Sequence, residues 1–248
     1  MARKKYLTRP GPYLLHAELL RNLVLSFDEY PYRLPVVRNF ERLAFHPKVT
    51  FFVGENGSGK STVLEALAVA YGLNPEGGTR NFNFQTQASH SSLSDSIRLA
   101  KVAGVAGESF FLRAESFYNV ASEIDRLDVV RSYGSKSLHE QSHGESFFAL
   151  FKNRFRHHGL YFLDEPEAAL SPNRQLEFLA LLHDFVSGGA QFVIATHSPI
   201  ILAYPNAKIL LFDGAGIREI AYTDTDHYKV TRGFLSNHKN MLSELLKP

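Results

Sequence analysis

The glycine-rich stretch "GENGSGKS", Gly54 to Ser61, constrains this chain more than any other segment. The run "KVTFFV" before it is short, apolar and rich in β-branched and aromatic residues, which predicts a strand. The segment "KSTVLEALAVAYGL" after it repeats apolar residues with a 3.6-residue period, which predicts an amphipathic helix. Glycines between a strand and a helix let successive backbone N–H groups converge on a phosphate at the helix N-terminus. The stretch therefore predicts a phosphate-binding loop inside an α/β fold.

The loop also predicts which groups bind the ligand. Lys60 would reach the β- and γ-phosphates, and the hydroxyl of Ser61 would bind Mg²⁺. A chance match in a glycine-rich turn is the alternative, but the flanking strand and helix make it a poor one. The expected nucleotide-binding residues are Gly54, Glu55, Asn56, Gly57, Ser58, Gly59, Lys60, Ser61 and Thr62.

A second segment, "GLYFLDEP", predicts a buried strand that ends in two acids, Asp164 and Glu165. Adjacent acids are usually surface charge, but an apolar run that ends in two carboxylates needs a reason. The first carboxylate can bind Mg²⁺ and the second can polarise an attacking water. We therefore expect Asp164 to be a metal ligand and Glu165 to be catalytic.

Further segments place these motifs in one architecture. "AQFVIATHSP" is another buried strand that ends in polar residues, and "AKILLFDGAGIREI" predicts a strand and a hairpin. Buried strands that alternate with helices such as "SPNRQLEFLALLHDFV" predict a mainly parallel sheet. Near the N-terminus, "AELLRNLVLSF" and "RNFERLAF" predict an antiparallel pair of strands, and "SIRLAKVAGVAGESFFLRAES" predicts two strands around a Gly-Val-Ala-Gly turn.

Bulk properties limit the remaining classes. A chain of 248 residues suits one domain, residues 1–248, with a small subdomain inserted at about 77–155. The absence of cysteine excludes disulfides and suits a reducing, cytoplasmic location. Pro10, Pro12, His16 and Glu18 interrupt the N-terminal apolar run, so we expect no secretory signal and no membrane segment. A formal net charge of +2 does not by itself indicate nucleic acid.

Four motifs in order, "GENGSGKST", "QSHGES", "YFLDEPEAALSP" and "IATHSP", resemble those of the ATP-binding cassette (ABC) ATPases. The resemblance covers Gly54 to Pro199. It implies the P-loop NTPase fold of that family, with a mainly parallel central sheet, an N-terminal antiparallel β subdomain and a small inserted subdomain. ATP and Mg²⁺ are the implied ligands.

The resemblance also assigns roles to individual residues. It makes Glu165 the catalytic glutamate, His197 the switch histidine that contacts the γ-phosphate, and Ala169 to Ser171 part of the D-loop. Ser142 and Gly144 would belong to the signature motif that binds ATP held by another protomer, although His143 replaces the usual glycine. Gln85 is our candidate for the Q-loop glutamine, which also contacts Mg²⁺; Gln87 and His90 are alternatives. Phe27, Tyr30 and Tyr32 are candidates for the aromatic residue that stacks on adenine.

The resemblance implies an ATPase that dimerises head to tail around two ATP molecules. The motifs are most similar to those of RecF, SMC and OLD-type ATPases, which implies DNA repair, chromosome maintenance or phage defence. About 80 residues separate Lys60 from Ser142, too few for SMC arms, which at about 1.5 Å rise per residue need hundreds. DNA or a separate effector protein would be the partner. Two alternatives stay open: a subunit that energises a separate membrane transporter, and a nucleotide-gated interaction module with slow turnover.

Overall fold

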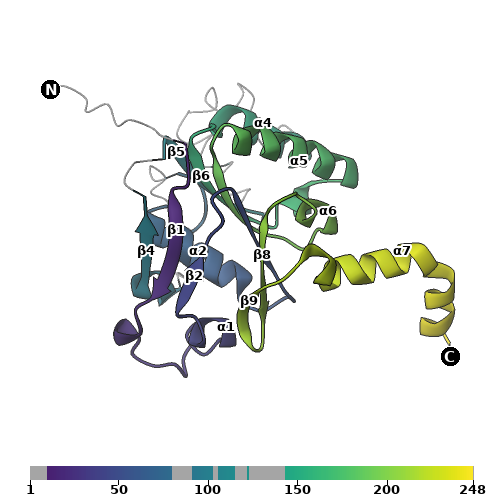
Figure 1. Cartoon of the computed structure of the whole chain (residues 1–248), viewed down its shortest axis with the longest axis horizontal. Coiled ribbons are helices and arrows are strands. Elements are labelled where there is room, and N and C mark those ends of the chain that lie inside the picture. Colours follow the sequence, from purple (N-terminus) through teal and green to yellow (C-terminus); the bar gives the residue numbers. More distant parts are fainter. Residues whose placement is uncertain (1–9, 80–90, 103–105, 115–121, 123–142, 248) are drawn as a thin grey trace.

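The computed structural model describes residues 10–79, 91–102, 106–114, 122 and 143–247 (Figure 1). Its strands form a six-stranded sheet in the order β5-β6-β7-β3-β8-β9 and a three-stranded sheet in the order β2-β1-β4. The strands are β1 Leu14–Leu19, β2 Arg42–Ala44, β3 Val49–Val53, β4 Ile97–Lys101, β5 Glu108–Arg113, β6 Gly159–Asp164, β7 Gln191–Ala195, β8 Lys208–Asp213 and β9 Gly216–Glu219.

The six-stranded sheet is parallel except at one edge. β3 pairs in parallel with β7 and β8, and β6 pairs in parallel with β5 and β7. Among its described strands, β9 alone is antiparallel, as the second arm of a hairpin with β8. Every residue of β3, β6 and β7 is buried, which explains why these strands are continuous apolar runs in the sequence. The predicted mainly parallel sheet is confirmed.

Helices cover both faces of this sheet, so successive side chains of a strand enter two different cores. Phe51 packs with helices α4 and α5 on one face, and Phe52 packs with helix α2 and the antiparallel sheet on the other. The α-helices are α1 Pro35–Arg38, α2 Lys60–Tyr71, α4 His143–Arg154, α5 Pro172–Ser187, α6 Pro199–Leu202 and α7 Asp226–Leu245. Short 3-10 helices in the described part of the chain are η1 Arg21–Leu23, η2 Ser92–Ser96, η5 Pro166–Ala169 and η6 Tyr222–Asp224.

The antiparallel sheet confirms the predicted N-terminal pair but changes its details. β1 starts and ends earlier than expected, and the chain turns into η1 where the sequence suggested more strand. β2 is short because Pro35 begins helix α1 within the region between the two strands. β4 pairs with β1, whereas β5 pairs with β6, so the two strands predicted around one turn belong to different sheets.

One buried glutamine connects the two sheets. The Gln191 side-chain oxygen accepts hydrogen bonds from the backbone N–H groups of Tyr13 and Leu14, at 2.8 and 2.9 Å. Its amide nitrogen donates to the carbonyl oxygens of Leu14 and His46, at 2.8 and 2.9 Å. All of the amide's polar capacity is therefore used to fix β1 beside the start of β7.

Helix α7 leaves the body of the molecule and carries the C-terminus away from it (Figure 1). None of its residues is buried, and Asn237 interrupts it with non-helical angles of φ −146° and ψ 34°. Within the described residues, no helix is both long and apolar enough to cross a membrane. The single domain with an insertion at about 77–155 stays a prediction, because residues 80–90, 103–105, 115–121 and 123–142 lie outside the described part.

Candidate nucleotide-binding site

The loop between β3 and α2 has the backbone that its glycines predict. Gly54, Gly57 and Gly59 have φ angles of +148°, +79° and +95°, which residues with side chains rarely adopt. A Cβ atom on Gly54 would also collide with the carbonyl oxygen of Phe212 on β8. The loop can therefore lie against β8, with the N-terminus of α2 at its end.

Lys60 is buried at the start of α2, with 4% of its surface exposed. Its ammonium group donates hydrogen bonds to the carbonyl oxygens of Gly54 and Glu55, at 2.9 and 2.8 Å. Burial lowers the pKa of this lysine, although the charges of Glu165 and Asp164 oppose that shift. The two hydrogen bonds hold the ammonium group of Lys60 across the loop, where an anionic ligand would pair with its charge.

Ser61 and Asp164 meet although they belong to different elements. The Ser61 hydroxyl, on the first turn of α2, donates to Oδ1 of Asp164 at 3.0 Å. Asp164 ends β6 and is 6% exposed. A hydroxyl and a carboxylate are the hard oxygen ligands that Mg²⁺ takes in nucleotide sites, where it keeps several waters. This pair therefore fits a Mg²⁺ ion, and Asp164 and Ser61 are the residues that would hold it.

Glu165 follows with a backbone conformation unusual for a glutamate. Its φ and ψ angles are 51° and 53°, in the left-handed region, and its N–H donates to the carbonyl oxygen of Ala195 at 2.9 Å. Such conformations persist where the surrounding structure imposes them, and they cluster at functional sites. Oε1 of this residue lies 3.6 Å from Nε2 of His197. Two of the predicted catalytic residues are thus neighbours.

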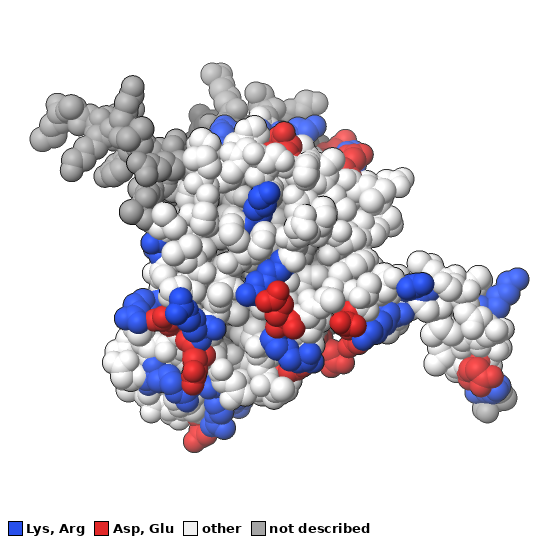
Figure 2. Space-filling model, viewed as in Figure 1, with Lys and Arg blue, Asp and Glu red and all other residues white. Residues whose placement is uncertain are grey.

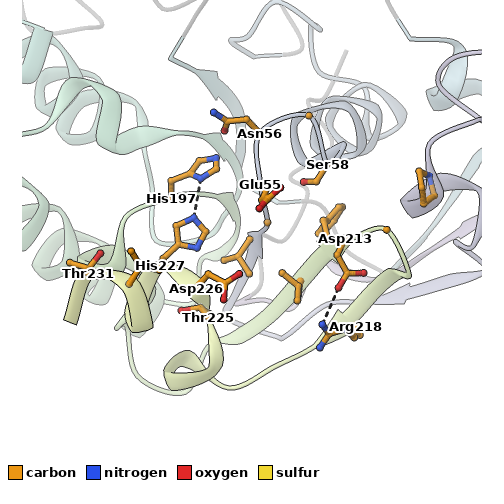
Figure 3. A pocket seen from close by; sticks show the side chains of 18 residues that line it. Glu55, Asn56, Ser58, His197, Asp213, Arg218, Thr225, Asp226, His227 and Thr231 are labelled. Carbon is orange, nitrogen blue, oxygen red and sulfur yellow. Dashed lines mark hydrogen bonds and ion pairs between the residues drawn. The ribbon is translucent and has the colours of Figure 1, made fainter. Parts of the chain in front are cut away.

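His197 follows β7 and is held at both its backbone and its ring. The carboxylate of Glu167 accepts the backbone N–H of His197 at 2.5 Å and the hydroxyl of Thr196 at 2.8 Å. The ring atom Nδ1 lies 3.0 Å from Nε2 of His227, on the first turn of α7 (Figure 3). Burial, the charge of Lys60 and His227 lower the pKa of His197 to about 4. The ring is therefore neutral near pH 7.

Glu167 and His227 are functional candidates that the sequence analysis missed. Glu167 is the third acid of "DEPE", so a search for buried acids near the strand end could have found it. Burial raises its pKa, and the hydrogen bond from the backbone of His197 opposes that shift. His227 lies outside every motif, and only the tertiary position of α7 brings it to the site.

A cavity of about 1020 Å³ opens beside the phosphate-binding loop (Figure 3). One wall is the loop, and the other is made by the β8–β9 hairpin and the first turns of α7. Its lining residues are Pro35, Val53, Gly54, Glu55, Asn56, Gly57, Ser58, His197, Leu211, Phe212, Asp213, Gly214, Arg218, Thr225, Asp226, His227, Val230 and Thr231. Ser58 Oγ is buried without a hydrogen-bond partner among the described residues, as expected in a loop that awaits a polar ligand.

The three aromatic candidates for adenine stacking occupy different environments. Tyr32 is 8% exposed, and its hydroxyl bonds Ser96 in the core. Phe27 packs edge-on against Tyr32, with ring centroids 6.3 Å apart. Tyr30 is 56% exposed, and its hydroxyl lies 3.0 Å from that of Thr62. Of the three, Tyr30 has an exposed ring next to the loop.

Several predicted residues cannot be placed. Gln85, its alternatives Gln87 and His90, and Ser142 lie outside the described residues. Gly144 lies in the first turn of α4, where an added Cβ would be 3.3 Å from the carbonyl oxygen of Ala169 in the predicted D-loop. The structure thus brings together Lys60, Ser61, Asp164, Glu165 and His197, and leaves the Q-loop and most of the signature as predictions.

Comparison with known proteins gives matches to two family models. Residues 27–142 match a model described as an AAA domain, and residues 138–203 match one described as an AAA domain, putative AbiEii toxin, Type IV TA system. Both matched segments are therefore similar to AAA domains. This similarity agrees with the geometry of the phosphate-binding loop. No curated protein matches the chain in sequence.

The chain is also similar to several solved structures. A putative metal-chelate type ABC transporter matches with a TM-score of 0.50 and 18% identity over 88% of each chain. An ATP-binding cassette of an ABC transporter in its ADP conformation matches with 0.47 and 16%, over 96% of this chain and 100% of that chain. The SMC head domain from Thermotoga maritima matches with 0.41 and 16%, over 72% and 92%. At these identities the first match shows the fold alone, and it confirms the predicted ABC ATPase fold.

Proposed function

We propose that this chain is a Mg²⁺-dependent ATPase. The observation that carries the proposal is the contact of the Ser61 hydroxyl with Asp164, at 3.0 Å, beside the loop that holds the ammonium group of Lys60. Glu165 and His197 lie 3.6 Å apart in the same site. A phosphate-binding loop, a metal-ligand pair and a candidate for the water-orienting carboxylate are the parts that P-loop phosphoryl transfer needs.

Each side chain has a distinct task in this proposal. Backbone N–H groups of the loop and Lys60 bind the β- and γ-phosphates and orient them. Glu165 orients the attacking water and accepts its proton. His197 donates a hydrogen bond from Nε2 to a γ-phosphate oxygen. Ser61 and Asp164 would hold Mg²⁺, which would neutralise the charge that develops on the phosphates.

We extend the proposal to a head-to-tail dimer around two ATP molecules. Among the described residues, none from α4 lines the cavity beside the phosphate-binding loop. Gly144, at the start of α4, lies beside Ala169 instead. The signature segment of a second copy would then contact the ATP held by the first, and closure would complete the site.

The test is ATP hydrolysis by the purified chain with Mg²⁺ and with EDTA. We expect hydrolysis only with Mg²⁺, a loss of ATP binding in Lys60→Ala, and a fall in kcat of at least about 100-fold in Glu165→Gln with ATP still bound. Lys48→Ala, an exposed lysine before β3, is the matched control. Light scattering of Glu165→Gln with ATP should give a dimer; a monomer at saturating ATP would refute the sandwich.

We further propose that the ATPase cycle serves DNA maintenance or phage defence. The motif resemblance supports this role, and so does the description of the second matched family model as a putative toxin. On the face shown in Figure 2, basic side chains alternate with acidic ones. The described residues also form exposed ion pairs, such as Arg38 with Asp28 and Arg218 with Asp213, both at 2.9 Å. Charge alone therefore does not mark a DNA groove on this face.

DNA dependence is directly measurable. We expect double-stranded DNA to stimulate hydrolysis at low salt and to lose that effect at moderate salt, because phosphate contacts weaken steeply with salt. A rate of ATP hydrolysis that DNA does not change at either salt concentration would refute the DNA role and favour a protein partner.

A further inference from the structure

His227 lies on the first turn of α7, 30 positions from His197 in sequence but 3.0 Å from it between ring nitrogens. We propose that His227 is a positioning residue of the ATPase site, which fixes the ring of His197 so that its Nε2–H faces the γ-phosphate of the bound nucleotide. The proposal rests on the proposed ATPase function. It gives the first turn of α7 a task in the reaction, although no motif of the sequence includes it.

The hydrogen bond couples the protonation of the two rings. In a contact between Nδ1 of His197 and Nε2 of His227, one atom donates and the other accepts. If His227 donates, the proton of a neutral His197 is on Nε2. A phosphate oxygen only accepts hydrogen bonds, so a histidine that contacts it needs a proton on the nitrogen that faces it. With His227 as the donor, which is the arrangement we propose, the contact supplies that tautomer.

The free nitrogen of His197 faces the site. Nε2 is buried and has no hydrogen-bond partner among the residues the structure describes, and the nearest carboxylate oxygen is that of Glu165 at 3.6 Å. A buried polar atom without a hydrogen-bond partner is energetically unfavourable, so we expect Nε2 of His197 to bind a ligand. Figure 3 shows the two rings on the wall of the cavity opposite Ser58.

The frame that holds His227 is tied to the segment after His197. Thr225, the N-cap of α7, is 1% exposed; its hydroxyl accepts from the N–H of Tyr228 at 3.2 Å and donates to the carbonyl of Tyr222 at 2.8 Å. The Tyr222 hydroxyl donates to the carbonyl of Pro199 at 2.8 Å. Both histidines therefore sit on one hydrogen-bonded frame, which limits their relative motion.

Both rings share an environment that keeps them neutral. Burial lowers the pKa of each, and the charge of Lys60 lowers it further. Asp226 opposes the shift at His227. Two neutral rings hold one N–H each, so the tautomers of the pair are linked.

Kinetics of a matched pair of variants tests the proposal. His227→Gln keeps an N–H donor near the position of Nε2, whereas His227→Leu has none. We expect kcat to fall about 10- to 100-fold in His227→Leu, with KM for ATP within about threefold, since the phosphate-binding loop is unchanged. His227→Gln should recover most of kcat. Leu235→Ala, an exposed residue of α7 that does not line the cavity, should hydrolyse ATP as the wild type does.

Histidine NMR provides a second readout that needs no turnover. In nucleotide-free protein labelled with ¹⁵N-histidine, we expect His197 in the Nε2–H tautomer for the wild type and His227→Gln, and a mixture of tautomers for His227→Leu. Melting temperatures of all variants separate this effect from a loss of folding. A rotameric or packing role alone would impair His227→Gln and His227→Leu equally.

Three results would overturn the proposal: an Nδ1–H tautomer of His197 in the wild type, a wild-type kcat in His227→Leu, or equal impairment of both His227 variants. A wild type with the expected tautomer, which His227→Leu loses, but with no hydrolysis of ATP would support the contact and refute the ATPase function. The two failures are therefore distinguishable.

Discussion

The hydroxyl of Ser61 donates to Oδ1 of Asp164 at 3.0 Å across 103 positions of sequence. This contact joins the helix that follows the phosphate-binding loop to the end of β6. It forms only because β6 and β3 run in the same direction on either side of β7, so that their carboxyl ends reach the same edge of the sheet.

Substitution of Asp164 by Asn should weaken the binding of Mg²⁺ more than the binding of ATP. The carboxylate would lose its charge but keep its size, so we expect the Mg²⁺ concentration for half-maximal hydrolysis to rise at least about 10-fold. Binding of ATP measured in EDTA should stay within about threefold of the wild type, because the loop and Lys60 are intact. Asp184→Asn, on the exposed face of α5, is the control. Equal Mg²⁺ dependence in Asp164→Asn and the wild type would contradict the assignment.

Glu167→Gln should lower the free energy of unfolding as well as kcat. The carboxylate accepts from both the His197 N–H and the Thr196 hydroxyl, but the amide offers only one acceptor oxygen. We expect the free energy of unfolding to fall by about 1–3 kcal/mol. Urea unfolding measures this. Glu177→Gln removes the exposed ion pair with Arg174 and should change stability by no more than about 0.5 kcal/mol; an equal loss in both variants would count against the Glu167 contacts.

Tyr30 and Tyr32 should respond oppositely to truncation. Tyr30→Ala removes an exposed ring beside Thr62, so we expect ATP affinity to fall about 10-fold while the melting temperature changes little. Tyr32→Ala removes a buried ring and should lower the free energy of unfolding by about 3–5 kcal/mol. Isothermal titration and urea unfolding test the pair. Unchanged ATP affinity in Tyr30→Ala would exclude that ring as the adenine platform.

Two glycines of the loop should differ sharply in their tolerance of a methyl group. In Gly54→Ala the new Cβ would meet the carbonyl oxygen of Phe212, whereas in Gly57→Ala nothing lies within 4 Å. Gly57→Ala should therefore cost only the strain of its positive φ, about 1–2 kcal/mol, and Gly54→Ala clearly more. Urea unfolding of both variants measures the difference. Equal costs would mean that the loop does not lie against β8 as described.

Stability should depend on pH through His197. Its pKa is lowered from 6.5 to about 4, so the unfolded chain binds more protons than the folded one between these values. The stabilisation is fully present above pH 6.5 and is lost as the pH falls toward 4. Relative to His197→Gln, we expect the wild type to lose on the order of 3 kcal/mol over this range. Unfolding curves at several pH values would disprove this if both proteins lost stability in parallel.

Much of the fold follows from local sequence. β3, β6 and β7 are apolar runs because both faces of the sheet are covered, and Ser171 as N-cap and Pro172 in the first turn mark the start of α5. Strand partners are not local information. β4 and β5 follow each other in the chain, yet β4 joins β1 and β5 joins β6.

For the candidate site, the local sequence likewise predicts where the residues inside motifs lie. Lys60 and Asp164, for example, lie where strand and helix ends converge. His227 was beyond reach, because its approach to His197 depends on where α7 lies. Among Phe27, Tyr30 and Tyr32, burial alone separates the exposed ring from the two packed ones, and burial of one aromatic rather than its neighbour is set by tertiary packing.

Helix α7 starts on the wall of the cavity beside the phosphate-binding loop, and Val230, Leu235 and Leu245 are more than half exposed along it. Its 20 residues would span about 30 Å if straight. α7 thus connects the wall of this cavity, at its first turns, with an exposed segment on the other side of the kink at Asn237. If nucleotide binding changes the affinity of a partner for the exposed part of α7, the partner must change the affinity for the nucleotide by the same factor, because linkage is reciprocal. A partner that binds the exposed part of α7 would then regulate the reaction beside its first turn.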